Sequence, residues 1–162
     1  MNESPSPLFW PEHFPPENRW DSFLMGIPAL GPDLSFFKDL MQNQADRTEE
    51  VMAAWSDERE RRVALSLGER LQKQWGWKKP YFIPADQMLA VVCGPDFWAY
   101  FESDLSDVFE EFNEQLGKRL KPEFWETLID WNDKSVCFGE LVHKLTAELL
   151  ARADFAADTG ET

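Results

Sequence analysis

The segment FESDLSDVFEEFNEQLG, residues 101–117, decides the predicted fold because its apolar and acidic side chains separate at helical spacing. With Leu105 as the reference and ~100° per residue, the apolar side chains fall within about 60° of it. The acidic side chains fall on the opposite side, at roughly 140–240°. The apolar face contains Val108, Phe109, Phe112 and Leu116, and the acidic face contains Asp107, Glu110, Glu111 and Glu114. The pattern predicts a helix over 104–117 that buries one face and presents carboxylates to solvent.

The segment before this helix, residues 46–77, also has a helical pattern. Val63, Leu67 and Leu71 recur every four positions, which predicts a buried stripe. The run SDE at residues 56–58 is typical of a helix start, so we expect two helices that meet there. Gly76 is placed to end the second of them.

Further helices are predicted at both ends of the chain. One begins after Pro32, with Asp33 as its cap, and a short one begins near Pro122. The last helix is expected over 136–151, with an apolar face of Phe138, Leu141, Val142, Leu145 and Leu149. The run MLAVVC, residues 88–93, is compatible with a helix turn or a short strand. The sequence therefore predicts an all-α fold.

The first 32 residues form a separate segment rich in proline and aromatic residues. Seven of the eleven prolines lie here, and those in LFWPEHFPPENRW (8–20) exclude a regular helix. Two interpretations stay open: an arm packed across its own domain, or a polyproline-like ligand that docks on a partner. We divide the chain into an extension, 1–45, packed on a helical domain, 46–151, and a flexible tail, 152–162.

Composition and charge limit the partners. With 43% hydrophobic and 14% aromatic residues, the 162-residue chain can form a core. The net charge of −14 argues against nucleic acid and anionic membranes as partners. Residues 59–79 form the one basic island of the sequence. No secretory signal or apolar run of membrane-spanning length is present, so we expect a cytoplasmic protein whose Cys93 and Cys137 are free thiols.

The residues typical of catalysis are sparse. No phosphate-binding glycine loop and no nucleophile elbow is present. Cys93, Cys137, His13 and His143 do not have the spacing of a zinc site. His143 is expected on the exposed side of the last helix, and Cys93 is expected to be buried and inert. We therefore predict a protein that is not an enzyme and holds no metal.

The run WGWKK, residues 75–79, is a candidate basic and aromatic patch. Trp75 and Trp77 could stack on bases next to Lys78 and Lys79. The competing interpretation places the tryptophans at the end of a core helix, and the acidic character of the whole chain favours it.

The order of elements after Asp57 resembles the acyl carrier protein family over about 95 residues, Asp57 to Ala151. LGKRLKPEFWETL (116–128) resembles the family's step from the second helix to the third, and FGELVHKLTAEL (138–149) resembles its closing helix. The resemblance implies a four-helix bundle, to which this chain adds an N-terminal arm and extra helices. It also implies that the acidic second helix is the surface recognised by positively charged partner enzymes.

The sequence departs from the family where the prosthetic group is attached. In the family, the order Asp-Ser-Leu places a phosphopantetheine arm on the serine, whereas this chain has Ser103-Asp104-Leu105. A shift of one residue turns a helical side chain by about 100°, and a short polar side chain there is typical of helix capping. The expected form is therefore a carrier-like domain without the cofactor. The alternative is an active carrier modified with phosphopantetheine at Ser103.

The functional prediction is an interaction module. Its partner is a protein with a basic docking surface, and homo-oligomers are a further option. The predicted docking face consists of Asp104, Asp107, Glu110, Glu111 and Glu114. A third hypothesis, an acidic inhibitor or immunity-type mimic of nucleic acid, requires a continuous negative surface and therefore conflicts with the basic island at 59–79.

Overall fold

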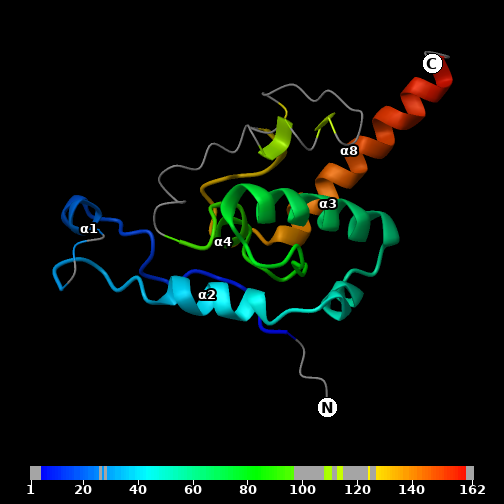
Figure 1. Cartoon of the computed structure of the whole chain (residues 1–162). Helices are drawn as coiled ribbons and strands as arrows, with labels where there is room; N and C mark the ends of the chain where they lie inside the picture. The colour runs from blue at the N-terminus through cyan, green and yellow to red at the C-terminus, as the bar shows by residue number, and fades with distance from the viewer. Residues whose placement is uncertain are drawn as a thin grey trace.

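The computed structural model describes residues 5–25, 27, 29–96, 108–110, 113–114, 124 and 127–159. Its elements are α1 (Arg19–Leu24), α2 (Phe36–Ala45), the 3₁₀ helix η1 (Glu49–Ala54), α3 (Glu58–Trp75), α4 (Met88–Val92) and α8 (Phe138–Thr159). The described residues contain no strand, and they show one isolated antiparallel bridge, between Gln87 and Cys137. The predicted all-α class is thus confirmed for this part of the chain (Figure 1).

Helix α3 has the caps and the buried stripe that its sequence predicts. The Asp57 carboxylate accepts hydrogen bonds from the backbone N–H groups of Arg59 and Glu60, which would otherwise lack partners. Gly76 ends the helix in the left-handed region at φ 78°, where glycine avoids a steric cost. The buried residues are Val63, Ala64, Leu67, Gly68 and Leu71.

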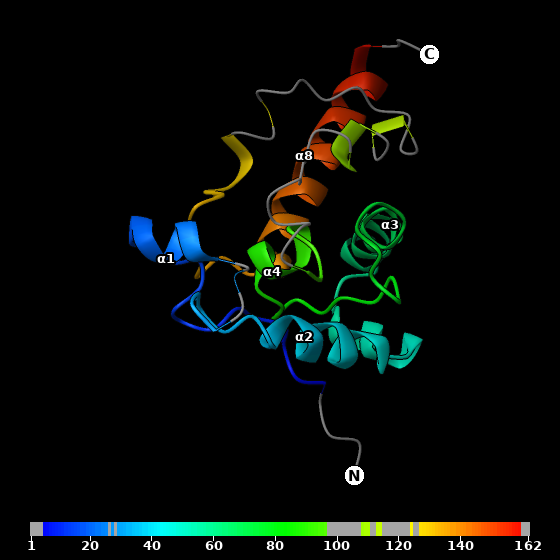
Figure 2. The same ribbon diagram turned by 60° about the vertical axis from the view of Figure 1, so that its left-hand side comes forward.

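Helix α8 packs against α3 and α4 to form the centre of the molecule (Figures 1 and 2). Phe138, Leu141, Val142 and Leu145 are completely buried, as the apolar face of the last helix predicts. The run MLAVVC forms a helix rather than a strand, and Met88, Ala90, Val91 and Val92 of α4 are buried.

Aromatic side chains fill the core between these helices. The Phe82 and Phe138 ring centroids are 5.7 Å apart, and Trp55 meets Phe138 edge-on at 6.1 Å. Two buried indoles also donate hydrogen bonds, Trp55 to the Phe82 carbonyl at 2.9 Å and Trp77 to the Val91 carbonyl at 3.0 Å. Because each indole N–H has a hydrogen-bond partner, the cost of removing it from water is offset and the large rings can be buried.

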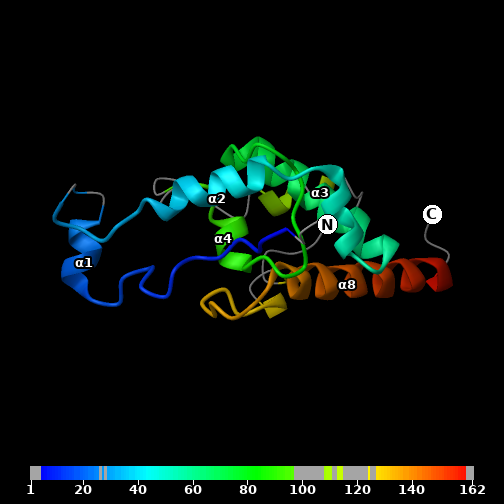
Figure 3. The same ribbon diagram turned by 90° about the horizontal axis from the view of Figure 1, so that it is seen from below.

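The proline-rich segment runs past the start of α4 (Figure 3). Leu8, Trp10 and Phe14 are buried in the common core. The Gln87 backbone N–H donates to the Leu8 carbonyl at 2.7 Å, and the Trp10 backbone N–H donates to the Gln87 side chain at 2.8 Å. Residues 8–14 are therefore an integral part of the packed structure.

Two predicted helix boundaries are wrong. Helix α2 begins at Phe36, because Asp33 accepts hydrogen bonds from the Ser35 N–H and hydroxyl in a local turn instead of capping a helix. These bonds lower the pKa of Asp33 below its usual value. Helix α8 continues to Thr159, through residues predicted as part of a flexible tail. Residues 152–159 contain no glycine or proline, and three of them are alanine, which favours continuation of the helix.

Candidate functional site

Arg47 and Asp86 form a buried ion pair with several further hydrogen bonds. Both guanidinium NH₂ groups contact the carboxylate at 2.7 Å, in a two-pronged geometry. The same carboxylate accepts the backbone N–H groups of Leu8 and Ile83, each at 2.8 Å. Arg47 also donates to the Tyr81 carbonyl at 3.2 Å and to the Ser6 carbonyl at 3.0 Å. The pair therefore ties the end of α2 to the arm and to the segment before α4.

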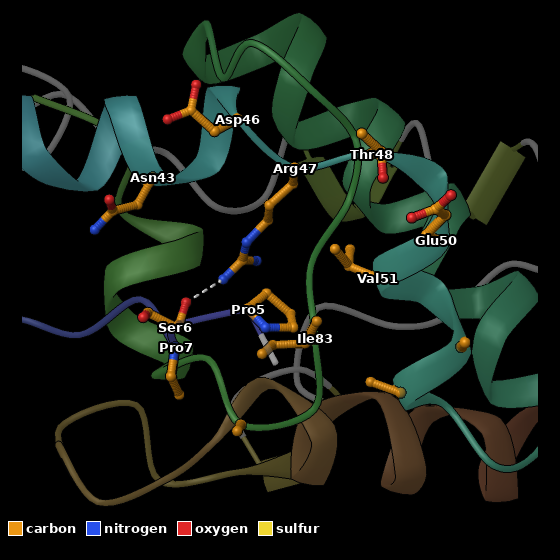
Figure 4. A pocket seen from close by; sticks show the side chains of 13 residues that line it. Pro5, Ser6, Pro7, Asn43, Asp46, Arg47, Thr48, Glu50, Val51 and Ile83 are labelled. Atoms are coloured by element: carbon orange, nitrogen blue, oxygen red, sulfur yellow. Dashed lines mark hydrogen bonds between the residues drawn. The ribbon is translucent and has the colours of Figure 1, made fainter. Parts of the chain in front are cut away.

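A pocket of about 1080 Å³ opens beside this pair (Figure 4). Arg47 reaches into it from the end of α2, and the hydrogen bond from Arg47 to Ser6 crosses it. The lining includes the carboxylates of Asp46 and Glu50 and the hydroxyls of Ser6 and Thr48, but neither histidine nor cysteine. The guanidinium NH₂ groups are already bonded within the chain. This arrangement provides a structural link between α2, the arm and the segment before α4.

The cysteine and histidine side chains do not converge on a reactive site. Burial raises the pKa of the Cys93 thiol to about 12, so it is protonated near neutral pH. His143 is exposed on α8, as predicted, and its Nδ1 lies 2.6 Å from a Glu60 carboxylate oxygen on α3. Within the described ranges, no three His, Cys, Asp or Glu side chains are arranged to hold a metal ion.

The predicted carboxylate face falls only partly on described residues. Residues 108–110 and 113–114 are helical, with Glu110 and Glu114 exposed. Val108 and Phe109 are buried, and the Phe109 ring packs 5.6 Å from that of Trp131. Ser103, Asp104, Asp107 and Glu111 lie outside the described residues, together with Leu105 and Phe112.

The candidate aromatic and basic patch at residues 75–79 is only partly exposed. Trp77 is only 2% exposed, because its ring packs against Phe82 and its indole N–H bonds to the α4 backbone. Trp75 is half-buried, whereas Lys78 and Lys79 are exposed. The alternative interpretation, in which the tryptophan belongs to the core, describes Trp77.

Sequence reasoning missed helix α1 and the apolar group that it carries. Trp20 and Phe23 are 75% and 73% exposed, and Ile27 and Leu30 follow in the next turn. We call these four residues the apolar α1 surface. The spacing of Trp20 and Phe23 places both on one face of a helix, which was the available signal. The surrounding prolines obscured it, because they favour an irregular arm.

In the described part of the chain, no helix is both long and apolar enough to cross a membrane. Comparison with protein-family models, with characterised proteins and with solved structures finds no match to this chain.

Proposed function

We propose that this chain is a non-enzymatic interaction module with an acyl-carrier-like helical bundle, which docks through carboxylates on a protein with a basic surface. The observation that carries the proposal is the separation of side chains within residues 108–114. Val108 and Phe109 are buried, whereas Glu110 and Glu114 are exposed. At its described positions, this helix offers negative charge while its apolar side chains are buried. Such a face steers a basic partner and orients it more than it contributes affinity.

The packing of α3 and α8 supports the carrier-like bundle. In the proposed correspondence, α3 is the first helix of the bundle and α8 the fourth, and these two pack together. The second and third helices correspond to residues 104–117 and to the region beginning near Pro122. Helix α4 and the arm are additions to this plan. The free thiols of Cys93 and Cys137 agree with a reducing location such as the cytoplasm.

The chemistry of the described residues favours binding over catalysis. Cys93 is kept protonated by burial, and the pocket beside Arg47 is lined by neither histidine nor cysteine. Exposed cations on and after α3, among them Arg59, Arg62 and Lys73, interrupt a continuous negative surface. This island argues against the nucleic-acid mimic.

The absence of an attached arm is tested by intact mass. We expect no gain in mass after incubation with coenzyme A and a promiscuous phosphopantetheinyl transferase, because Asp104 occupies the position of the family's serine. An authentic acyl carrier protein in the same reaction is the positive control. A gain of one phosphopantetheine that is lost in Ser103→Ala would identify an active carrier instead.

The docking face is tested by charge reversal. Tagged wild-type protein and the double variant Glu110→Lys/Glu114→Lys are purified from the native host, and co-purifying proteins are quantified by mass spectrometry. We expect the amount of co-purifying basic partner to fall by about tenfold or more in the variant, because the introduced lysines repel the positive charges on the partner's surface. The same partners should be lost from wild type as salt rises toward ~1 M, where the Debye length is short.

A matched control reverses the charge at two exposed glutamates outside the proposed docking face. Glu69 on α3 and Glu148 on α8 are exposed, so Glu69→Lys/Glu148→Lys makes an equal change in net charge. This control should retain the partners. Equal retention by both double variants would show that the carboxylates at 110 and 114 take no part in docking. Circular dichroism establishes that each variant is folded.

A further inference from the structure

The apolar α1 surface has no packing partner in the described structure. Helix α1 buries none of its residues, and Figure 1 shows it at one end of the molecule, away from α3 and α8. Six large hydrophobic residues are exposed in the described chain, and four of them, Trp20, Phe23, Ile27 and Leu30, lie between residues 20 and 30. A group of this kind is typical of a protein interaction site, whereas a single exposed hydrophobic residue is not.

Local bonds hold this surface in shape. The Asn18 side chain caps α1 by accepting the Asp21 N–H at 2.7 Å. After the helix, the Ile27 N–H donates to the Leu24 carbonyl and the Gly31 N–H donates to the Ile27 carbonyl. A Cβ at Gly31 would lie 2.1 Å from the Leu24 oxygen, so this close return of the chain requires glycine. The surface is therefore organised before any partner binds, which lowers the entropy cost of binding.

Carboxylates line a hollow beside the same surface. The hollow has a volume of about 700 Å³ and is lined by Glu12, His13, Glu17, Asp21 and Leu30, together with Gly31 and prolines. Residues 5–33 carry four carboxylates and one permanent cation, Arg19, and the Lys134 ammonium donates to the Glu12 carbonyl at 3.2 Å, so this region keeps a net negative charge. The partner that complements this combination is both apolar and basic. An exposed tryptophan also attracts a Lys or Arg side chain to its ring face.

We infer that the apolar α1 surface binds an amphipathic segment of another protein, with its apolar side chains on Trp20 and Phe23 and a Lys or Arg in the acidic hollow. A second copy of this chain fits less well, because a two-fold contact would bring the same carboxylates together. This inference rests on the proposed function only in assigning a role in protein–protein contact. It uses different residues, so the two can fail separately.

The test uses two synthetic helical peptides as probes. One places Leu at positions i, i+3, i+4 and i+7 and Lys at the others to form an amphipathic helix, and the other replaces each Leu by Ser at equal charge. Binding is measured by isothermal titration calorimetry at ~0.15 M salt, where long-range attraction between surface charges is screened. We expect wild type to bind the Leu/Lys peptide at least about tenfold more tightly than the Ser/Lys peptide, since exposed aromatic side chains dominate interfaces.

Two double variants and one control locate the site. Trp20→Ala/Phe23→Ala should weaken binding of the Leu/Lys peptide by about tenfold or more. Its melting temperature should match wild type, because these side chains are not buried. Glu12→Gln/Glu17→Gln should weaken the same binding by about threefold or more. Phe9→Ala removes a 61% exposed ring outside the surface and should leave affinity unchanged.

Several outcomes would overturn the inference. One is unchanged affinity of Trp20→Ala/Phe23→Ala for the Leu/Lys peptide. A wild-type dimer that this variant dissociates would assign the surface to a second copy. Binding to zwitterionic vesicles that depends on Trp20 and Phe23, without peptide binding, would assign it to a lipid surface. Glu110→Lys/Glu114→Lys should still bind the Leu/Lys peptide, because these residues lie outside the apolar α1 surface. The peptide assay therefore tests the apolar α1 surface independently of the proposed docking face at Glu110 and Glu114.

Discussion

Replacing Arg47 by alanine should lower the free energy of unfolding by about 3–5 kcal/mol. The Arg47 side chain is 2% exposed and that of Asp86 is fully buried, so the substitution leaves a buried carboxylate without its cation. The Ser6 and Tyr81 carbonyls lose a donor at the same time. Most of the cost comes from the uncompensated charge, because a buried ion pair contributes little net stability when it is intact. We expect the melting temperature to fall on the order of 10 °C.

Arg62→Ala is the matched control for this measurement. Arg62 is 78% exposed and lies 3.5 Å from Glu58 on the same helix, so its loss should cost less than about 0.5 kcal/mol. Urea denaturation followed by circular dichroism compares the two variants. Hydrogen exchange of the Leu8 and Trp10 amides should also accelerate in Arg47→Ala, since the arm loses an anchor. Equal stability of both variants would contradict a structural role for the Arg47–Asp86 pair.

Gly68→Ala should destabilise the protein by about 2–3 kcal/mol, although alanine is the better helix former. Gly68 lies inside α3, where exchange of an exposed glycine for alanine typically stabilises by up to ~1 kcal/mol. A Cβ at this position would lie 1.9 Å from the Pro80 carbonyl oxygen and 2.8 Å from its carbon. Backbone atoms of the segment after α3 must therefore move, and this disturbs the nearby ring of Phe82.

Stabilisation by Gly68→Ala would mean that the segment at Pro80 does not lie against α3. Gln74→Ala, at an exposed position of the same helix, should change stability by less than about 0.5 kcal/mol and controls for helix propensity. Chemical denaturation measures both variants, and near-ultraviolet circular dichroism reports the packing of the neighbouring aromatic rings.

The parts of the fold that sequence predicts are those with a long, regular pattern. The buried stripe of α3 repeats Val63, Leu67 and Leu71, and Gly76 ends the helix as a glycine at that position should. The α8 face is predicted from Phe138 to Leu145 for the same reason. When apolar residues keep a helical period over several turns, the pattern predicts the helix even if single residues depart from it. The ends of helices depend on single hydrogen bonds. Because Asp33 bonds to Ser35 in a local turn, α2 begins at Phe36 and not directly after Asp33.

The features that sequence reasoning missed depend on distant contacts or short elements. Arg47 and Asp86 are 39 residues apart, and no local pattern distinguishes either from a surface charge. Helix α1 has only six residues, too few for a periodic pattern. The sequence favoured a core position for the tryptophans, but no local pattern indicates that the Trp77 indole N–H pairs with the Val91 carbonyl of α4. Pairings of this kind arise from tertiary structure, which propensities do not encode.

The arm has a consequence for how the chain acquires its structure during translation. The Leu8 amide bonds to a carboxylate 78 residues later in the sequence, and Leu8, Trp10 and Phe14 are buried in the core. The ribosome therefore releases the arm well before residue 86, and until then these apolar side chains stay in water. Nascent chains of intermediate length should be substrates for chaperones that bind exposed aromatic segments. Because so distant a loop closes slowly, the first residues to be made are among the last to reach their native positions.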